Sequence, residues 1–218
     1  MTSSNYHLQQ RVEHYGVPIV DAQAVVVLVH GRTITPEYMN EFVIQRLEIE
    51  NITYVAPAAQ GNTWFPKGFL EPLAENQIGI DFTLERLETI GADLLAKGIS
   101  PKKIIWCGFS QGASALCQLM ATKPRRWGAL IAFTGGLIGP PGTQWNIDGD
   151  FAGMPAYFCT SDVDPHVPEF RVKETADLFK SAGAEVKSEF FIGRPHEISD
   201  AEIAQAKSMI LQVVATSI

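Results

Sequence analysis

The sequence predicts a single α/β domain in which helices cover both faces of a mostly parallel central sheet. The chain has 218 residues, of which 46% are hydrophobic, and this is enough for one domain with a sizeable buried core. From residue 24 onward, short apolar runs alternate with longer segments of helical periodicity. Such alternation is typical of parallel strands joined by right-handed helical crossovers.

The first half of the chain alternates between buried strands and amphipathic helices. Residues 24–29 (AVVVLV) are a continuous β-branched run, which indicates a strand covered on both faces. Residues 36–50 keep an apolar stripe at helical spacing after Thr35, a residue type that often caps helices. Residues 52–56 form a second short buried run, and residues 79–97 return to helical spacing.

The same two patterns continue to the C-terminus. Short runs of β-branched and aromatic residues predict strands, and apolar residues three or four apart predict helices. In chain order these are a strand at 103–108, a helix at 111–122, strands at 129–134 and 155–160, a helix at 169–182, a strand at 186–191 and a helix at 199–214. Residues 1–23 are expected to be an irregular segment or an edge strand of the same domain, which spans residues 1–218.

Charge and cysteine content exclude several classes of protein. The 24 acidic and 17 basic residues give a net charge of −7, the opposite of what phosphate-binding nucleic-acid proteins show. The three cysteines form no CxxC pair, which disfavours a disulfide framework or a structural zinc site. No apolar run is long enough to span a bilayer, and the N-terminus lacks a signal-peptide pattern. We therefore expect a cytoplasmic protein with no nucleic acid, no integral membrane association, no metal and no cofactor.

The strongest functional signal is the sequence GFSQG at residues 108–112. A predicted strand ends directly before it, and a predicted helix rich in small residues begins directly after it. A nucleophile elbow requires this corner, because the Ser110 hydroxyl must project beyond the carboxyl edge of the sheet. The start of the helix also favours negative charge beside the serine. The alternative interpretation is that Ser110 only caps the helix.

A serine hydroxyl needs a base that is itself oriented by a third group. Among the five histidines, His196 follows the last predicted strand, so we expect it at the same carboxyl edge as Ser110. The acidic loop at 161–168 follows another strand and is expected at that edge as well. His7 and His14 lie in the N-terminal segment and are expected at the surface.

The acidic loop also raises the question of a metal site. Asp162, Asp164 and His166 lie within five residues of one another. Three ligands so close together rarely enclose a tetrahedral ion without distant partners, so a solvent-facing His166 is the favoured interpretation. Both aspartates stand near the end of a strand, and periodicity does not choose between them.

Together these motifs resemble the phospholipase/carboxylesterase group of α/β-hydrolases, small lidless esterases that include acyl-protein thioesterases. The matching segments occur in the family order over about residues 24–214: LVHG at 28–31, GFSQGA at 108–113, DVDPHVP at 162–168 and GRPH at 193–196. The resemblance implies an α/β-hydrolase fold with Ser110 as nucleophile, Asp164 as acid and His196 as base. The chain departs from the family at Arg32 and Ser161, where glycine is common, so substrate preference does not transfer from a relative.

The developing oxyanion needs two preorganised donors. The backbone N–H of Gln111 is expected to be one of them, and the resemblance points to the N–H of Arg32 as the other. The Arg32 side chain either neutralises an acidic substrate group or lies in solvent. Trp64 and Phe65 are candidates to line an acyl or aryl pocket, where the family has an aromatic residue; packing of their loop onto the core is the alternative.

The predicted function is cofactor-independent hydrolysis of carboxylic esters or thioesters of small to medium acyl groups through an acyl-enzyme. Acyl transfer or C–C hydrolysis on the same triad, and a non-catalytic ligand-binding role, are the alternatives. The expected partner is a small-molecule substrate, and a homodimer is also open. Because no segment is long enough for a lid domain, we expect the loops at 58–76 and 135–154 to cover the crevice.

Overall fold

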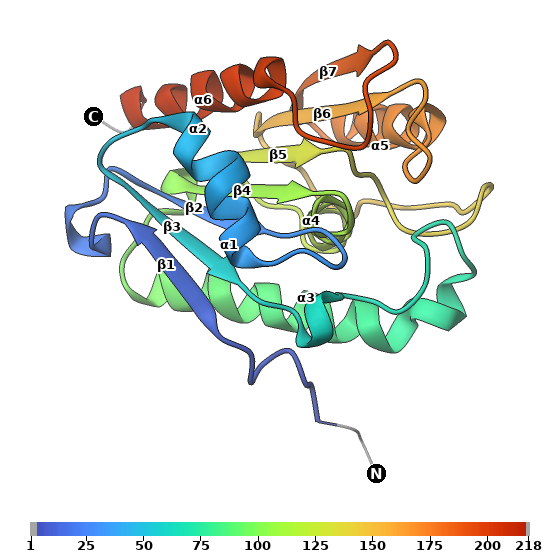
Figure 1. The fold of residues 1–218 in the computed structure, drawn as a ribbon, viewed down its shortest axis with the longest axis horizontal. Coiled ribbons are helices and arrows are strands. Elements are labelled where there is room, and N and C mark those ends of the chain that lie inside the picture. The colour runs from blue at the N-terminus through green and yellow to red at the C-terminus, as the bar shows by residue number, and fades with distance from the viewer. Residues whose placement is uncertain (1–3, 217–218) are drawn as a thin grey trace.

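The computed structural model describes residues 4–216, in which one seven-stranded sheet carries helices on both faces (Figure 1). The strands lie in the order β1-β3-β2-β4-β5-β6-β7. Their bounds are β1 (Val12–Gly16), β2 (Ala24–Val29), β3 (Ile52–Pro57), β4 (Ile104–Phe109), β5 (Ala129–Phe133), β6 (Pro155–Ser161) and β7 (Glu185–Phe191). β1 pairs antiparallel with β3, and all other neighbouring strands are parallel. The predicted fold class is therefore confirmed, with β1 as an edge strand.

Within residues 4–216, six α-helical segments connect or follow these strands. They are α1 (Pro36–Met39), α2 (Gln45–Leu47), α3 (Leu73–Ala96), α4 (Gln111–Thr122), α5 (Glu169–Ser181) and α6 (Asp200–Ala215). Single turns of 3-10 helix occupy Ile19–Asp21, Gln60–Asn62 and Pro101–Lys103. In Figure 1, α6 lies along one side of the sheet and α3 along the opposite side.

Two apolar cores, one on each face of the sheet, hold the layers together. Alternate side chains of β2 enter opposite cores, as the period of two in a strand requires. Val25, Val27 and Val29 pack with residues of α3, α4 and α5, whereas Val26 and Leu28 pack with residues of α1, α2 and α6. The continuous apolar run of β2 therefore reflects burial on both faces.

Two predicted helices differ from the observed ones. The helix expected at 36–50 is interrupted by a π-helical turn at Asn40–Ile44 and ends before Glu48, which has a left-handed φ of 49°. Its N-cap is Thr35 as predicted, and the Thr35 side chain accepts a hydrogen bond from the backbone N–H of Tyr38. The helix expected at 79–97 instead begins at Leu73, directly after Pro72, so the preceding loop is shorter than expected.

The loop at 135–154 packs along α5 because Arg171 binds its backbone. The fully buried Arg171 side chain donates hydrogen bonds to the carbonyl oxygens of Leu137 at 2.9 Å and Gly139 at 2.6 Å. Its guanidinium also lies 4.6 Å from the ring centroid of Trp145 in the same loop. These contacts hold the loop against α5.

The three cysteines, Cys107, Cys117 and Cys159, are free and buried. Burial raises the pKa of each thiol above its usual value. None of the helices between residues 4 and 216 has both the length and the apolarity needed to span a membrane.

Candidate active site

Ser110 lies at a sharp corner between β4 and α4. Its φ of 53° and ψ of −118° are a conformation that residues with a side chain seldom adopt. The backbone N–H of Ser110 donates to the carbonyl oxygen of Phe133, at the end of the neighbouring strand β5, at 2.9 Å. The corner is therefore fixed to the sheet, and the Ser110 hydroxyl stands beyond its carboxyl edge.

Gly112 permits α4 to start directly against the end of β2. A Cβ atom at this position would lie 2.3 Å from the carbonyl oxygen of Val29 and 2.4 Å from that of His30. Both contacts are with backbone, which cannot move aside as a flexible side chain can. The second glycine of the GFSQG sequence is thus required by close packing.

Three side chains from three loops form one hydrogen-bonded chain. The Nε2 atom of His196 lies 2.9 Å from the Oγ atom of Ser110, and its Nδ1 atom lies 2.7 Å from Oδ2 of Asp164. The Asp164 side chain is fully buried, whereas the His196 side chain is 20% exposed. The structure thus brings together the residues that the sequence motifs single out.

Hydrogen bonds hold Asp164 in its ionised form. Its Oδ1 atom accepts from the backbone N–H groups of His166 at 2.9 Å and Val167 at 2.8 Å. Burial alone raises the pKa of Asp164, but the hydrogen bond from His196 and these two amides outweigh it, so the pKa lies below its usual value.

Asp162, the other candidate acid, points elsewhere. Its Oδ1 atom accepts a hydrogen bond from the backbone N–H of Gly193 at 2.8 Å. Its own backbone N–H donates to the carbonyl oxygen of Phe191. Asp162 therefore fastens the end of β6 to the segment before His196, while Asp164 contacts the imidazole itself.

Two backbone N–H groups are available beside Ser110. Between residues 4 and 216, neither the amide of Arg32 nor that of Gln111 donates a hydrogen bond to another protein group. Gly31 brings the first of these close, since a Cβ atom there would lie 3.2 Å from the Cβ of Ser110. An amide of this kind, unpaired and beside a serine hydroxyl, is suited to binding an oxyanion.

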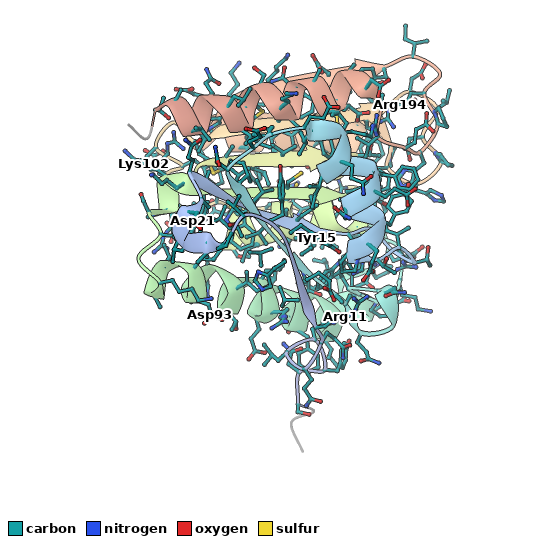
Figure 2. The ribbon with its side chains drawn as sticks, turned by 60° about the vertical axis from the view of Figure 1, so that its left-hand side comes forward. Arg11, Tyr15, Asp21, Asp93, Lys102 and Arg194 are labelled. Carbon is teal, nitrogen blue, oxygen red and sulfur yellow. The ribbon has the colours of Figure 1, made fainter. Side chains whose placement is uncertain are left out.

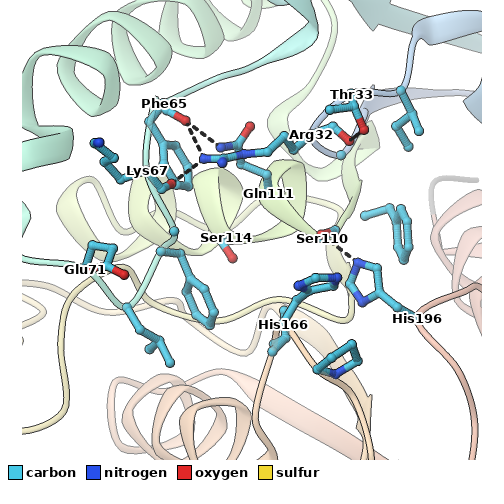
Figure 3. A pocket seen from close by; sticks show the side chains of 18 of the residues that line it. Arg32, Thr33, Phe65, Lys67, Glu71, Ser110, Gln111, Ser114, His166 and His196 are labelled. Carbon is cyan, nitrogen blue, oxygen red and sulfur yellow. Dashed lines mark hydrogen bonds between the residues drawn. The ribbon is translucent and has the colours of Figure 1, made fainter.

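The side chains of the same two residues hold one aromatic segment (Figure 3). The carbonyl oxygen of Phe65 accepts from the Arg32 guanidinium at 2.9 Å and from the Gln111 amide nitrogen at 2.7 Å. The Arg32 guanidinium also donates to the carbonyl oxygen of Lys67. The backbone N–H of Trp64 in turn donates to the Gln111 side-chain oxygen at 2.9 Å. Arg32 therefore engages backbone carbonyls rather than extending freely into solvent.

Trp64 and Phe65 occupy different environments. Trp64 is fully buried behind the site, and its indole N–H donates to the carbonyl oxygen of His30 at 2.8 Å. His30 is also buried: its Nε2 atom accepts from the backbone N–H of Ala59, and its Nδ1 atom lies 2.7 Å from the carbonyl oxygen of Gly31. Burial lowers the pKa of His30 to about 4, so the imidazole is neutral at pH 7.

A cavity of about 610 Å³ opens beside Ser110. Its wall includes the predicted residues Arg32, Phe65, Gln111 and His196, but not Trp64. The loop at 135–154 contributes no residue to this wall, because it is held along α5. Sequence reasoning missed the following lining residues: Ile34, Tyr38, Phe69, Leu70, Glu71, Ser114 and Val167.

His166 lies on the rim of the cavity next to His196. Its ring centroid is 5.0 Å from that of His196 in an edge-to-face arrangement, and its side chain is exposed. The Phe109 ring also packs against His196, with its ring centroid 5.0 Å from that of the imidazole. No group of three metal-ligating side chains is present in residues 4–216.

Comparisons with known proteins agree with this architecture. The family described as Phospholipase/Carboxylesterase matches residues 16–214. A phospholipase/carboxylesterase from Dyadobacter fermentans is 34% identical with a TM-score of 0.86, over 94% of this chain and 98% of that chain. Esterase PE8 is 21% identical with a TM-score of 0.74, over 94% and 99% of the two chains. SOBER1 from Arabidopsis thaliana is 18% identical with a TM-score of 0.71, over 88% and 99%. A comparison with curated protein sequences gave no match.

Proposed function

Because the chain belongs to the phospholipase/carboxylesterase family and is an esterase-type α/β-hydrolase, we propose that it cleaves small to medium carboxylic esters or thioesters through an acyl-enzyme. The observation that carries the proposal is the hydrogen-bonded chain from Asp164 through His196 to Ser110, which ends at an open cavity. In this proposal Ser110 is the nucleophile, His196 the general base and Asp164 the group that orients the base.

Acylation begins with attack of the Ser110 Oγ atom on the substrate carbonyl carbon. His196 Nε2 takes the hydroxyl proton, and the Asp164 carboxylate stabilises the imidazolium that results. The negative charge moves to the former carbonyl oxygen, where the amides of Arg32 and Gln111 are the proposed donors. His196 then returns the proton to the leaving alcohol or thiol as the tetrahedral intermediate collapses, leaving the acyl group on Ser110.

Deacylation repeats these steps with water as the nucleophile. A water molecule gives its proton to His196 Nε2 and attacks the acyl carbonyl, and the same two amides receive the charge. Collapse of the second intermediate returns the proton to Ser110 and releases the carboxylic acid. Every proton is exchanged with His196, so the reaction needs no metal or organic cofactor in this proposal.

The cavity supports a short or medium acyl or aryl group as the substrate. Phe65, Phe69, Leu70 and Val167 give it apolar wall, so they are the proposed contacts of the acyl group. Trp64 stands behind Phe65 without reaching the cavity, so we propose that it supports the wall rather than touching substrate.

A fluorophosphonate probe tests the proposal directly. The purified chain should gain the mass of one phosphonyl group, and peptide mapping should find it on Ser110. The same preparation is assayed with p-nitrophenyl esters and acyl thioesters of increasing chain length, with and without an added alcohol acceptor. Absence of both labelling and hydrolysis would refute the proposal, whereas acyl transfer to the alcohol in preference to water would identify a transferase.

A further inference from the structure

A buried polar cluster lies directly beneath the loop that carries His196. It includes Arg194, which is 7% exposed, and Glu202 in the first turn of α6, which is fully buried. Arg194 lies beside one end of α6 (Figure 2). Charged side chains are rarely buried unless their partners define their positions, so the contacts of this pair are informative.

Arg194 binds the chain on both sides of His196. Its Nη1 atom donates to the carbonyl oxygen of Pro195 at 2.8 Å and also to that of Glu197. These two carbonyls belong to the residues immediately before and after His196. The guanidinium therefore fixes the backbone from which the imidazole projects.

The Nη2 end of the guanidinium contacts the residue that follows β5, the strand whose last residue binds the Ser110 backbone. Arg194 Nη2 donates to the Oγ1 atom of Thr134 at 2.9 Å, and both side chains are buried. Thr134 directly follows Phe133, whose carbonyl oxygen accepts from the backbone N–H of Ser110. The planar Arg194 side chain thus connects the loop that carries His196 with the end of β5, beside Ser110.

Glu202 anchors Arg194 from the side of α6. Its Oε2 atom lies 3.5 Å from Arg194 Nε, a charge contact rather than a hydrogen bond. The same oxygen accepts from both the backbone N–H and the hydroxyl of Ser199 at 2.7 Å, and Oε1 accepts from the Cys159 thiol at 2.8 Å. The carboxylate is therefore held by β6 and by the N-terminus of α6 at once.

We propose that Arg194, held by Glu202, is a positioning residue that sets the distance between His196 and Ser110. The inference rests on the proposed function of Ser110 and His196. A buried ion pair adds little net stability compared with apolar side chains of the same size, so stability alone does not account for it. A planar group with five donors can bind the Pro195, Glu197 and Thr134 oxygens together, which a lysine ammonium cannot match in geometry.

The test measures kcat and KM for a short p-nitrophenyl ester in three variants. Arg194→Met should lower kcat by about a hundredfold, since a displacement of roughly 1 Å at a catalytic group costs about this much, while KM stays nearly constant. Arg194→Lys should recover part of kcat, and Glu202→Gln, which keeps the shape of the side chain, should lower kcat less than Arg194→Met. An unchanged kcat in properly folded Arg194→Met or Arg194→Lys would overturn the inference.

Arg86→Met is the matched control. Arg86 is also buried and also donates to a backbone carbonyl, but that carbonyl belongs to Gln10 in the N-terminal segment, at 2.8 Å, and not to the chain around His196. This variant should lower the midpoint of thermal unfolding and leave kcat unchanged. A loss of kcat that follows the loss of thermal stability equally at Arg86 and Arg194 would mean that Arg194 is only structural.

A double-mutant cycle separates positioning from general destabilisation. In a His196→Ala background, Arg194→Met should cause no further loss of kcat, because the group that it positions is absent. A full additional loss there would overturn the inference. Labelling of wild-type Ser110 by a fluorophosphonate keeps the two hypotheses apart: without labelling the proposed function fails, whereas labelling with unchanged kcat in Arg194→Met refutes only the role of Arg194.

Discussion

At the scale of single residues, the site concentrates strain and charge in a few side chains. Ser110 has a φ of 53°, and Asp164 is a fully buried carboxylate with three hydrogen-bond donors. Both conditions are unfavourable for the folded chain unless the surroundings maintain them. The two residues therefore give the sharpest tests of the proposed reaction.

Replacement of Ser110 should separate activity from stability. Ser110→Ala and Ser110→Gly should both lower kcat by about four to six orders of magnitude, because the nucleophile is lost. Glycine adopts the observed φ and ψ without strain, so Ser110→Gly should exceed Ser110→Ala in free energy of unfolding by about 1 kcal/mol. Ester hydrolysis and urea unfolding measure the two effects, and full activity in either variant would end the serine-hydrolase interpretation.

The two aspartates of the acidic loop should differ strongly in their effect on kcat. Asp164→Asn should lower kcat by about four orders of magnitude, because an amide in contact with Nδ1 favours the wrong imidazole tautomer. Asp162→Asn keeps the oxygen that accepts from Gly193, so its kcat should stay within about tenfold of wild type. Steady-state kinetics on both variants makes the comparison, and a reversed ranking would contradict the assignment.

At the scale of helices and strands, hydrophobic periodicity predicted the strands well and the helix bounds less well. The run at 24–29 is a strand with those bounds, and the helix at 111–122 also begins and ends where predicted. The π-helical turn at Asn40–Ile44 has no signature in an apolar stripe, since the stripe continues through it. The contact of Arg171 with the loop at 135–154 joins residues more than thirty positions apart, which local patterns do not encode.

In the candidate site, too, some residues were predictable from local sequence motifs, whereas the positions of others depend on tertiary contacts. Ser110 and His196 are recognisable because their spacing from strand ends and glycines is local, whereas Asp164 was singled out from Asp162 only by the family resemblance; the structure brings all three into contact. The burial of Trp64 depends instead on tertiary contacts with His30 and Gln111. The cavity wall at Phe69 and Leu70 depends equally on how the loop folds back.

The close packing of α4 against β2 predicts that a small substitution at Gly112 strongly lowers the free energy of unfolding. Gly112→Ala should destabilise the fold by about 2 to 5 kcal/mol, because the added methyl group overlaps two backbone carbonyls that must shift. Gly98→Ala is a useful comparison, since its φ is 83° but no atom lies within 4 Å of an added Cβ. Urea unfolding of the two variants should give the larger loss for Gly112→Ala; equal losses would mean that crowding at α4 is unimportant.

Histidine contacts with the loop that joins β3 to Trp64 predict that the free energy of unfolding decreases in mild acid. Two buried histidines accept hydrogen bonds from it: His30 from the backbone N–H of Ala59, and His7 from that of Gln60. The sequence-based expectation that His7 lies at the surface is therefore wrong, because these contacts draw it into the core. Burial lowers the pKa of both, to about 4 for His30. The unfolded chain therefore binds more protons between pH 6.5 and 4, so stability is complete above about pH 6.5 and falls as the pH decreases through that window.

Urea unfolding at several pH values measures this effect. His30 alone should remove roughly 3 kcal/mol between pH 7 and 4, and lowered carboxyl pKa values add their effect mainly below about pH 4.5. His30→Gln should reduce the slope between pH 6.5 and 5, whereas His14→Gln, at an exposed position, should leave it unchanged. An identical slope in wild type and His30→Gln would contradict the role of His30.

At the scale of the whole molecule, the cavity has loops but no separate domain above it. Residues within 65–71 form one wall, the loop at 135–154 lies along α5, and none of residues 4–216 makes a lid domain. Longer acyl chains should therefore gain at most about 0.8 kcal/mol in transition-state binding per methylene, and only until about 610 Å³ is filled.

Comparing dissolved with emulsified substrate tests whether the site is open without a lid. Rates on a triglyceride should not rise when its concentration passes the solubility limit, because no lid has to open at a lipid surface. A soluble short-chain ester measured in the same buffer serves as the reference. A sharp increase at the solubility limit, or a preference for long-chain emulsions, would contradict the expected open site.

The buried thiols make the chain its own reporter of local opening. A water-soluble maleimide should leave Cys107, Cys117 and Cys159 unmodified in the native state, since burial keeps them both inaccessible and protonated. Slow modification then measures how often each neighbourhood is exposed. The Cys159 thiol donates to Glu202 in the first turn of α6, and Cys107 lies in the central strand β4. The order in which Cys159 and Cys107 react would show whether the carboxyl edge of the sheet opens locally or only when the whole sheet unfolds.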